Sequence, residues 1–149
     1  MRSSLLLTER GIQAIARFTC PARKITGNLH FIIDTGSERS FLGWEDAEKL
    51  GLRVDALPGY PKPVLGFGGS AEAKHLREEC YIYLDFGDHG LQQVLLADGI
   101  LLYRPSKTRT KHWKRGPSVS ILGRDFLEES GYRLVVDLAA TELFLEKVT

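Results

Sequence analysis

The sequence predicts a mostly β fold with two short helices. Apolar residues recur in short runs that either alternate with polar residues or stay apolar throughout, and glycine, proline or small polar residues bound these runs, as is typical of strands. Only residues 44–51 and 124–130 have the composition and the end signals of helices. The chain has 149 residues, the size of one domain, and shows no internal repeat. We therefore expect a single domain over residues 1–149.

The first part of the chain is expected to form a β-hairpin. After a short irregular N-terminal segment, apolar and polar residues alternate from Gly11 to Cys20, and Pro21 ends the run. Residues 22–27 make a polar turn, and residues 28–34 return as the second strand.

A helix is predicted next, over residues 44–51, after a second short apolar piece at residues 40–43. Glu45 and Asp46 lie in its first turn, where acids suit the positive end of the helix dipole. Gly51 is suited to cap its C-terminal end.

The glycine-rich stretch at residues 64–71 must be distinguished from a nucleotide-binding loop. Gly66, Gly68 and Ala71 satisfy the G-x-G-x-x-A form of the dinucleotide-binding fingerprint. That fingerprint belongs to a strand–helix–strand unit, whereas the segments that follow both have the pattern of strands, at residues 81–86 and 91–96. We therefore expect a glycine-tipped β-hairpin and no dinucleotide.

The C-terminal part is expected to combine strands with the second helix. The predicted elements are a strand over residues 118–123, a helix over residues 124–130 closed by Gly131, and a hairpin of strands 132–138 and 142–148.

Residues 104–115 carry six Lys or Arg residues and no acid. Because the rest of the chain has 14 basic and 19 acidic residues, its net charge is −5. The basic run is poor in apolar residues, so we interpret residues 104–117 as a solvated surface insertion. The alternatives are a nucleic-acid contact with Trp113 as a stacking residue, and an exposed site of proteolytic cleavage.

The composition argues against several classes of protein. No apolar run approaches the roughly 20 residues that cross a bilayer, and residues 5–7 are too short for the apolar core of a signal peptide, so we expect a cytoplasmic protein without membrane contact. Cys20 and Cys80 form no CxxC pair and the four histidines lack metal-ligand spacing, so no metal or other cofactor is expected. The cysteines are expected to be buried thiols, with one disulfide as the alternative. The G-x-S-x-G motif of serine hydrolases is missing from the sequence.

The candidate functional site is the stretch Phe31–Ser37. Three apolar residues, two of them β-branched, predict a buried strand that delivers Asp34 to its end. An unpaired buried carboxylate costs several kcal/mol, so Asp34 needs a structural partner or a chemical use. The structural alternative is an Asx-type turn capped by the Thr35 and Ser37 hydroxyls.

Three features together resemble the retropepsin family, the single-domain aspartic proteases of retroviral type and their cellular relatives. They are Asp34-Thr35-Gly36-Ser37 after an apolar strand, a glycine-rich hairpin about 30 residues later, and Ile121-Leu122-Gly123-Arg124-Asp125-Phe126-Leu127. Their order and spacing match from about Gly11 to Leu145. The resemblance implies a retropepsin-like closed β-barrel or sandwich with one or two short helices and a glycine-rich flap hairpin.

The resemblance also implies an activity and an assembly. Peptide hydrolysis by this route needs two carboxylates that share one proton, one activating a water molecule while the other hydrogen-bonds to the scissile carbonyl. The chain has one Asp-Thr-Gly triplet. The implied protein is therefore an aspartic endopeptidase, acting on a peptide or protein substrate without a cofactor, whose site combines Asp34 of two chains in a homodimer.

Individual roles follow from the same resemblance. Asp34, Thr35 and Gly36 would be catalytic, with Thr35 bonding across the dimer axis and Gly36 offering its carbonyl to the substrate. Ser37 would contact substrate near the carboxylate and be placed to donate to it. The flap residues that would close over the peptide are Gly66, Phe67, Gly68, Gly69 and Ser70.

Support for the site is expected from the second motif. Ile121, Leu122 and Gly123 would pack beneath the active loop, the segment that carries Asp34-Thr35-Gly36-Ser37. Arg124 would form an ion pair with Glu38, and the alternative is that both charges are solvated.

Two further expectations concern partners. Residues 132–148 would supply much of the dimer interface. The alternative to an enzyme is a non-catalytic module of the same fold that binds an extended peptide, or nucleic acid through residues 104–115. The intact Asp-Thr-Gly-Ser favours chemistry, because a pure binder has no use for two close carboxylates.

Overall fold

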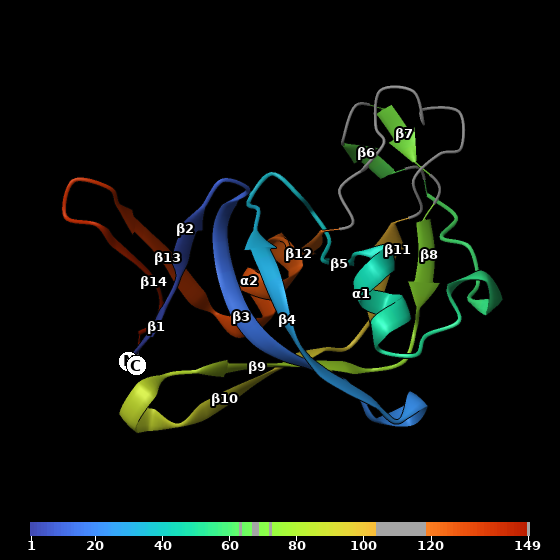
Figure 1. Cartoon of the computed structure of the whole chain (residues 1–149), viewed down its shortest axis with the longest axis horizontal. Coiled ribbons are helices and arrows are strands. Elements are labelled where there is room, and N and C mark those ends of the chain that lie inside the picture. The colour runs from blue at the N-terminus through green and yellow to red at the C-terminus, as the bar shows by residue number, and fades with distance from the viewer. Residues whose placement is uncertain (63, 67–68, 72, 104–118, 149) are drawn as a thin grey trace.

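The computed structural model describes residues 1–62, 64–66, 69–71, 73–103 and 119–148, and within these residues the chain is mostly β with two α-helices (Figure 1). The helices are α1, Trp44–Lys49, and α2, Arg124–Ser130. The strands are β1 Arg2–Ser4, β2 Leu6–Thr8, β3 Gly11–Cys20, β4 Ile25–Ile33, β5 Phe41–Leu42, β6 Val64–Gly66, β7 Gly69–Ala71, β8 Ala73–Leu76, β9 Cys80–Asp85, β10 Leu91–Leu96, β11 Ile100–Tyr103, β12 Ser120–Leu122, β13 Tyr132–Asp137 and β14 Glu142–Lys147.

Most strands belong to one curled sheet (Figure 1). Its order is β10-β9-β3-β4-β12-β5-β11-β8, and β2 also pairs with β3. The expected β3–β4 hairpin is confirmed, since the two strands pair antiparallel as far as Cys20 opposite Ile25. β12 pairs parallel with β4 and places Leu122 beside Ile33. Two segments far apart in the sequence therefore end side by side.

The core fills the inside of the curled sheet. Alternate residues of β3 from Ala14 to Cys20 are buried, whereas the residues between them are exposed or half-buried. Phe31 of β4, Leu122 of β12 and Phe126 of α2 are fully buried in the same core. Burial of each such large side chain contributes roughly 1.5–3 kcal/mol. The alternation therefore determines which face of β3 and β4 points inward.

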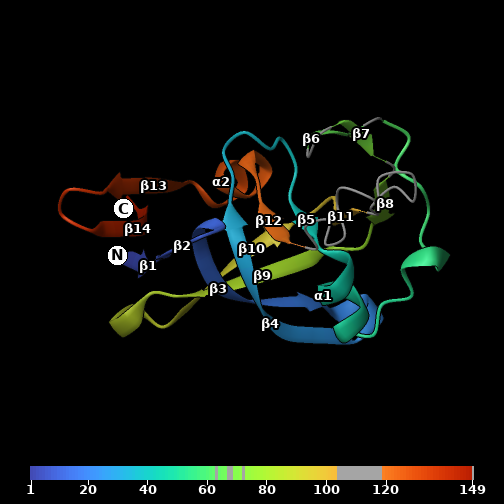
Figure 2. The same ribbon diagram turned by 45° about the horizontal axis from the view of Figure 1, so that its top comes forward.

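The two ends of the chain meet in a separate three-stranded sheet with the order β1-β14-β13 (Figure 2). The predicted C-terminal hairpin is confirmed, with Asp137 opposite Glu142. The N-terminal residues were expected to be irregular, and this expectation is wrong, because they form β1 and β2. β1 pairs with β14, with Ser3 opposite Leu145. A three-residue strand carries too little pattern to be found locally, and its partner lies at the other end of the chain.

Near the predicted flap, the glycine-rich hairpin is confirmed by the pairing of β6 with β7, in which Gly66 lies opposite Gly69. The sequence patterns did not predict β11, which lies between β5 and β8. Residues 100–102 of β11 are all buried. A strand buried on both sides shows a continuous apolar run, and the alternation of a half-buried strand is lost.

The end signals of both helices are confirmed. Gly51, shortly after α1, has a φ of +86°, and Gly131 ends α2 with a φ of +67°. Glycine adopts this left-handed conformation without the steric cost that a Cβ atom brings. Within the described residues, neither α1 nor α2 nor any shorter helical turn has the length and apolar character needed to span a membrane.

Several expectations concern residues outside the described ranges. They are the flap-tip residues Phe67 and Gly68, the basic run 104–115 and the wider insertion 104–117.

Candidate active site

Asp34 lies where β4 ends, beside the end of β12. Ile33, directly before it, is buried, and Asp34 itself is half-buried. The Asp34 N–H donates to Leu122 O at 3.0 Å, which continues the parallel pairing of the two strands by one residue. An acid therefore stands at the end of a core strand, as the sequence predicts.

The Asp34 side chain closes a tight turn. Its Oδ1 accepts a hydrogen bond from Gly36 N at 2.9 Å, and Ser37 N donates to Asp34 O at 3.2 Å. This is the Asx-type turn of the structural alternative, although within the described residues neither the Thr35 nor the Ser37 hydroxyl caps it. Within the described residues, no other hydrogen bond or ion pair reaches the Asp34 carboxylate. Its second oxygen is therefore available to a water molecule or another carboxylate.

The Ser37 hydroxyl does not donate to the Asp34 carboxylate, contrary to expectation. It donates to Arg39 O at 2.7 Å. The reason is local, because the Ser37 N–H already points back to Asp34 and the side chain reaches forward along the loop. Thr35 and Gly36 are exposed in the single chain, so both can contact a partner.

Backbone hydrogen bonds tie the loop after Asp34 to the turn between β12 and α2. Such bonds hold the loop against the core at Asp34, Ser37 and Glu38 and satisfy the backbone groups there. The donors and acceptors are Asp34 N to Leu122 O (3.0 Å), Arg124 N to Ser37 O (2.8 Å) and Asp125 N to Glu38 O (3.2 Å).

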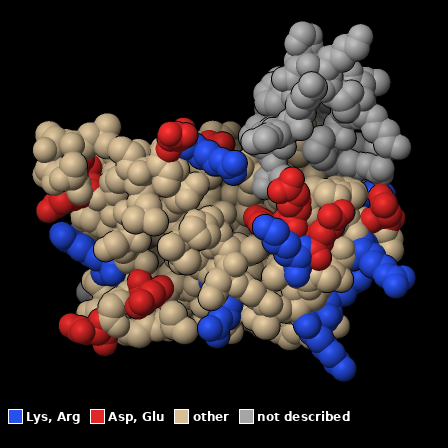
Figure 3. Space-filling view, viewed as in Figure 1, with Lys and Arg blue, Asp and Glu red and all other residues tan. Residues whose placement is uncertain are grey.

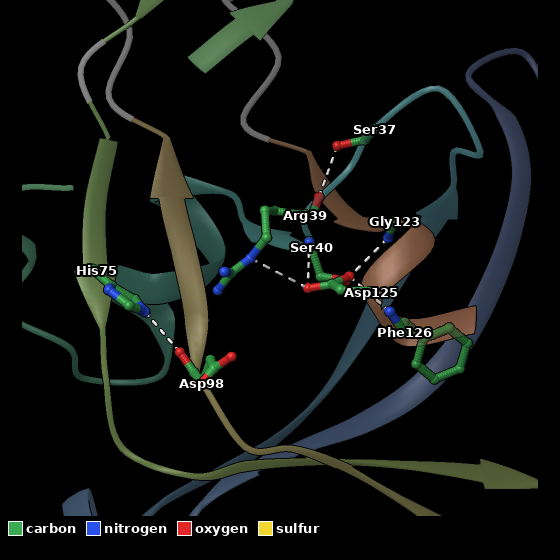
Figure 4. A network of polar contacts seen from close by, with 8 residues as sticks. All are labelled: Ser37, Arg39, Ser40, His75, Asp98, Gly123, Asp125 and Phe126. Carbon is green, nitrogen blue, oxygen red and sulfur yellow. Dashed lines mark hydrogen bonds and ion pairs between the residues drawn. The ribbon is translucent and has the colours of Figure 1, made fainter. Parts of the chain in front are cut away.

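Ser40 and Asp125 complete this connection with their side chains (Figure 4). The Ser40 hydroxyl donates to Asp125 Oδ1 at 2.6 Å and accepts from Gly123 N at 2.9 Å. Ser40 N donates to Asp125 Oδ2 at 3.0 Å, and Phe126 N donates to Oδ1 at 2.7 Å. Ser40 is fully buried. Its hydroxyl is satisfied as donor and as acceptor, which a buried polar group needs.

Arg39 forms an ion pair with Asp125, at 3.6 Å between Nε and Oδ2. The expected pair of Arg124 with Glu38 is wrong, since no ion pair joins these residues in the described part of the chain and both are exposed. The residues that do pair, Arg39 and Asp125, directly follow Glu38 and Arg124 in the sequence. The sequence places the charges near each other, but the direction in which side chains leave the two backbones decides which of them meet.

Gly123 is required by close packing. A Cβ atom on this residue would lie 2.6 Å from both Ser37 O and Arg39 O, closer than carbon and oxygen approach. Its φ of −97° is open to any residue. The glycine is therefore needed because two backbones touch, and not because of its own conformation.

Of the residues predicted to support the site, Ile121, Leu122 and Gly123 are buried. Leu122 O accepts from Asp34 N, and Gly123 lies against the backbone of Ser37 and Arg39. Arg124 contributes its backbone N–H rather than its side chain. The predicted flap residues Gly66, Gly69 and Ser70 lie in the β6–β7 hairpin.

Sequence reasoning missed Arg39, Ser40 and Asp125. A signal was present, because Ser40 opens an apolar run and Asp125 lies in the first turn of a helix that packs on the core. Polar residues that must be buried need partners. The neighbouring sequence does not indicate which partner each of these residues binds.

A groove of about 530 Å³ runs along the outward face of β4 beside α1. Asn28, His30 and Lys49 are among its lining residues, and none of residues 34–40 lines it. It is therefore separate from the candidate site.

The architecture matches a known fold. A crystal structure of a retropepsin-like aspartic protease from Rickettsia conorii aligns with a TM-score of 0.52 over 98% of this chain and 97% of that chain, at 18% identity. The EIAV protease in complex with the inhibitor HBY-793 aligns over 83% of this chain and 91% of that chain, at 20% identity and a TM-score of 0.46. The fold is that of the retropepsin-like aspartic proteases.

Sequence comparison gives the family. A family model described as aspartyl protease matches residues 26–126, a range that includes both segments of the candidate site. The chain belongs to this aspartyl protease family. A search of curated proteins finds no match.

Proposed function

We propose that this protein is an aspartic endopeptidase in which Asp34 of two chains activates the water molecule that attacks a peptide bond. The observation that carries the proposal is the Asp34 carboxylate itself. It stands at the end of a core strand, with Oδ1 held by Gly36 N and with no further partner among the described residues. Membership of the aspartyl protease family supports the same chemistry.

The chemistry needs two carboxylates that titrate as a pair. Two acids at contact distance cannot both ionise, so they share one proton. The ionised carboxylate takes a proton from the water, and the protonated one donates to the scissile carbonyl as charge develops on its oxygen. Thr35 would brace the two loops across the dimer axis, while Gly36 and Ser37 would contact the substrate backbone.

One chain supplies one half of this pair. The triplet Asp-Thr-Gly occurs once in the sequence. A homodimer with a two-fold axis next to Asp34 brings the second carboxylate. We place much of its interface on residues 132–148, where Val136 and Leu138 are 44% and 62% exposed in the single chain.

The substrate would be an extended peptide held between the active loop and the β6–β7 hairpin. Hairpin closure would exclude water and supply backbone hydrogen bonds, which are independent of the peptide sequence. All these parts lie within residues 1–149, which we treat as one domain.

The face of the molecule shown in Figure 3 does not favour the nucleic-acid alternative. Acidic and basic side chains of the described residues are interspersed over most of this face, and the basic side chains that gather at its lower right edge are few. The basic run 104–115 lies outside the described residues.

The test is cleavage of a random peptide library at about pH 4–6, an acidic range suited to a pair of carboxyl groups that shares one proton. The purified protein is compared with the Asp34→Asn variant, with pepstatin as inhibitor and sedimentation in the same buffer. Cleavage that the variant and the inhibitor abolish, in a dimeric protein, is the expected result. A folded dimer that cleaves nothing, or a variant that cleaves equally well, contradicts the proposal.

A further inference from the structure

Cys20 and Cys80 face each other across neighbouring strands. β3 and β9 pair antiparallel as far as Thr19 opposite Tyr81. Continuing this register by one residue places Cys20, the last residue of β3, opposite Cys80, the first residue of β9. Directly opposed Cα atoms in antiparallel strands are about 4.5–5.5 Å apart, within the roughly 4.4–6.8 Å that a disulfide spans. The backbones therefore already have the separation that a bridge needs.

Both thiols point into the same apolar core. Cys20 and Cys80 are free and fully buried, which confirms the expectation of buried thiols. The Cys80 thiol donates to Glu78 O at 3.3 Å. Burial raises the pKa of the Cys80 thiol, and the adjacent Cys20 thiol raises it further. The strand register and the shared burial therefore place the two thiols beside each other on the inward face of the sheet.

We propose that Cys20 and Cys80 are the site of an intramolecular disulfide, formed during folding in the presence of a small-molecule disulfide oxidant, that joins β3 to β9. The first cysteine thiolate attacks the oxidant, which gives a mixed disulfide and releases one small thiolate. The second cysteine thiolate attacks the sulfur of the first, forming the Sγ–Sγ bond and releasing the other small thiolate. The two cysteine protons pass to the released thiolates, so the cysteines are oxidised and the oxidant is reduced.

The structure restricts when this step can occur. The attacking species is a thiolate, and a fully buried thiol neither ionises readily nor meets an oxidant. In the unfolded chain both thiols are exposed. The bridge therefore forms before β3 and β9 close over it, and the folded reduced protein resists oxidation.

The bridge would enclose residues 21–79, which include the active loop, α1 and the β6–β7 hairpin. Closing a long loop restricts the unfolded chain more than the folded one, which raises stability. The oxidised protein would thus be a more stable form of the same fold.

The test refolds the full chain from denaturant, either with a glutathione and glutathione disulfide mixture or with a phosphine reductant. In the glutathione mixture we expect a mass lower by two hydrogen atoms, a peptide that links Cys20 to Cys80, and a thermal midpoint higher by about 5–15 °C than in the reductant. The folded reduced protein in the same mixture should keep both thiols at least about 100-fold longer than the unfolded chain.

Other products would overturn the proposal. They are a glutathione adduct on either cysteine, chains linked to each other through cysteine, or a bridged chain that is less stable than the reduced one. The Cys20→Ala and Cys80→Ala variants should have the same thermal midpoint after refolding in the glutathione mixture as in the reductant. If a variant fails to fold, the mass and peptide map of the refolded natural chain still decide. No activity measurement enters, so the outcome is independent of the proposed protease function.

Discussion

The Ser40 hydroxyl donates to Asp125 Oδ1 at 2.6 Å and accepts from Gly123 N at 2.9 Å, so one buried side chain joins the two segments that build the candidate active site. Ser40 follows the Asp34 loop by a few residues, and Asp125 lies in the first turn of α2, whose first backbone N–H groups donate to that loop. The loop is therefore held from the side away from the exposed Asp34–Gly36 turn, which leaves Thr35 and Gly36 open to a partner.

Replacing Ser40 by alanine should test this connection. Ser40→Ala leaves Gly123 N without its acceptor and Asp125 without one donor, so the free energy of unfolding should fall by about 1–3 kcal/mol. Denaturant titration measures the change, and peptidase activity should fall with it. The matched control is Ser37→Ala, because the Ser37 hydroxyl donates to one backbone carbonyl and is only half-buried. An equal loss of unfolding free energy in both variants would contradict the special role of Ser40.

The ion pair of Arg39 with Asp125 can be separated from the pair that the sequence predicted. A double-mutant cycle with Arg39→Met and Asp125→Asn should give a coupling energy of about 0.5–1 kcal/mol, because both side chains are partly exposed to solvent. The same cycle with Arg124→Met and Glu38→Gln should give a coupling close to zero. Coupling in the second pair alone would show that the loop adopts another register.

Gly123 should tolerate no side chain. Gly123→Ala forces the Ser37 and Arg39 carbonyls to move away, which should cost about 1–3 kcal/mol in the free energy of unfolding and displace the active loop. Gly59→Ala is the control, because a Cβ atom there would meet nothing within 4 Å. Thermal unfolding and activity should both change for the first variant alone. A stable and active Gly123→Ala protein would refute the close approach.

The terminal sheet should weaken in acid. A hydrogen bond from Arg133, which lies opposite Glu146 on the neighbouring strand, lowers the pKa of Glu146 below its ordinary value of 4.5. A lowered folded-state pKa means that the pair stabilises above the unfolded-state pKa, and that this stability is lost as the pH falls through the lowered value.

The variant Glu146→Gln isolates this contribution. It should be less stable than the natural chain at about pH 7 and should match it at about pH 2, where both forms lack the charge. Urea titrations at several pH values measure the difference. Glu142→Gln is the control on the same strand, since Glu142 has no ion pair within the described residues. A pH-independent difference for Glu146→Gln would exclude the ion pair as its cause.

A local sequence pattern was sufficient to predict those strands and helices whose signals lie within one segment of the chain. The alternation from Gly11 to Cys20 and the end glycines of the two helices report burial and backbone conformation directly. β1 and β11 were missed for a different reason. One is too short to show a period, and the other is buried on both faces and shows none.

In the candidate site, too, some features follow from a local sequence pattern and others do not. The position of Asp34 follows from the strand that precedes it, which the sequence shows plainly. The partners of Ser40 and Arg39 depend on how two distant backbones are rotated against each other, which no local pattern records. The resemblance suggested an ion pair of Arg124 with Glu38, whereas the ion pair present joins their neighbours Asp125 and Arg39.

The central claim is that each active site needs Asp34 from two chains. The most direct measurement co-refolds the natural chain with the Asp34→Asn variant in equal amounts and compares peptidase activity per total chain with that of the natural protein. If chains pair at random and both carboxylates are needed, about one quarter of the activity remains. If each chain works alone, about one half remains, and that result would contradict the shared site.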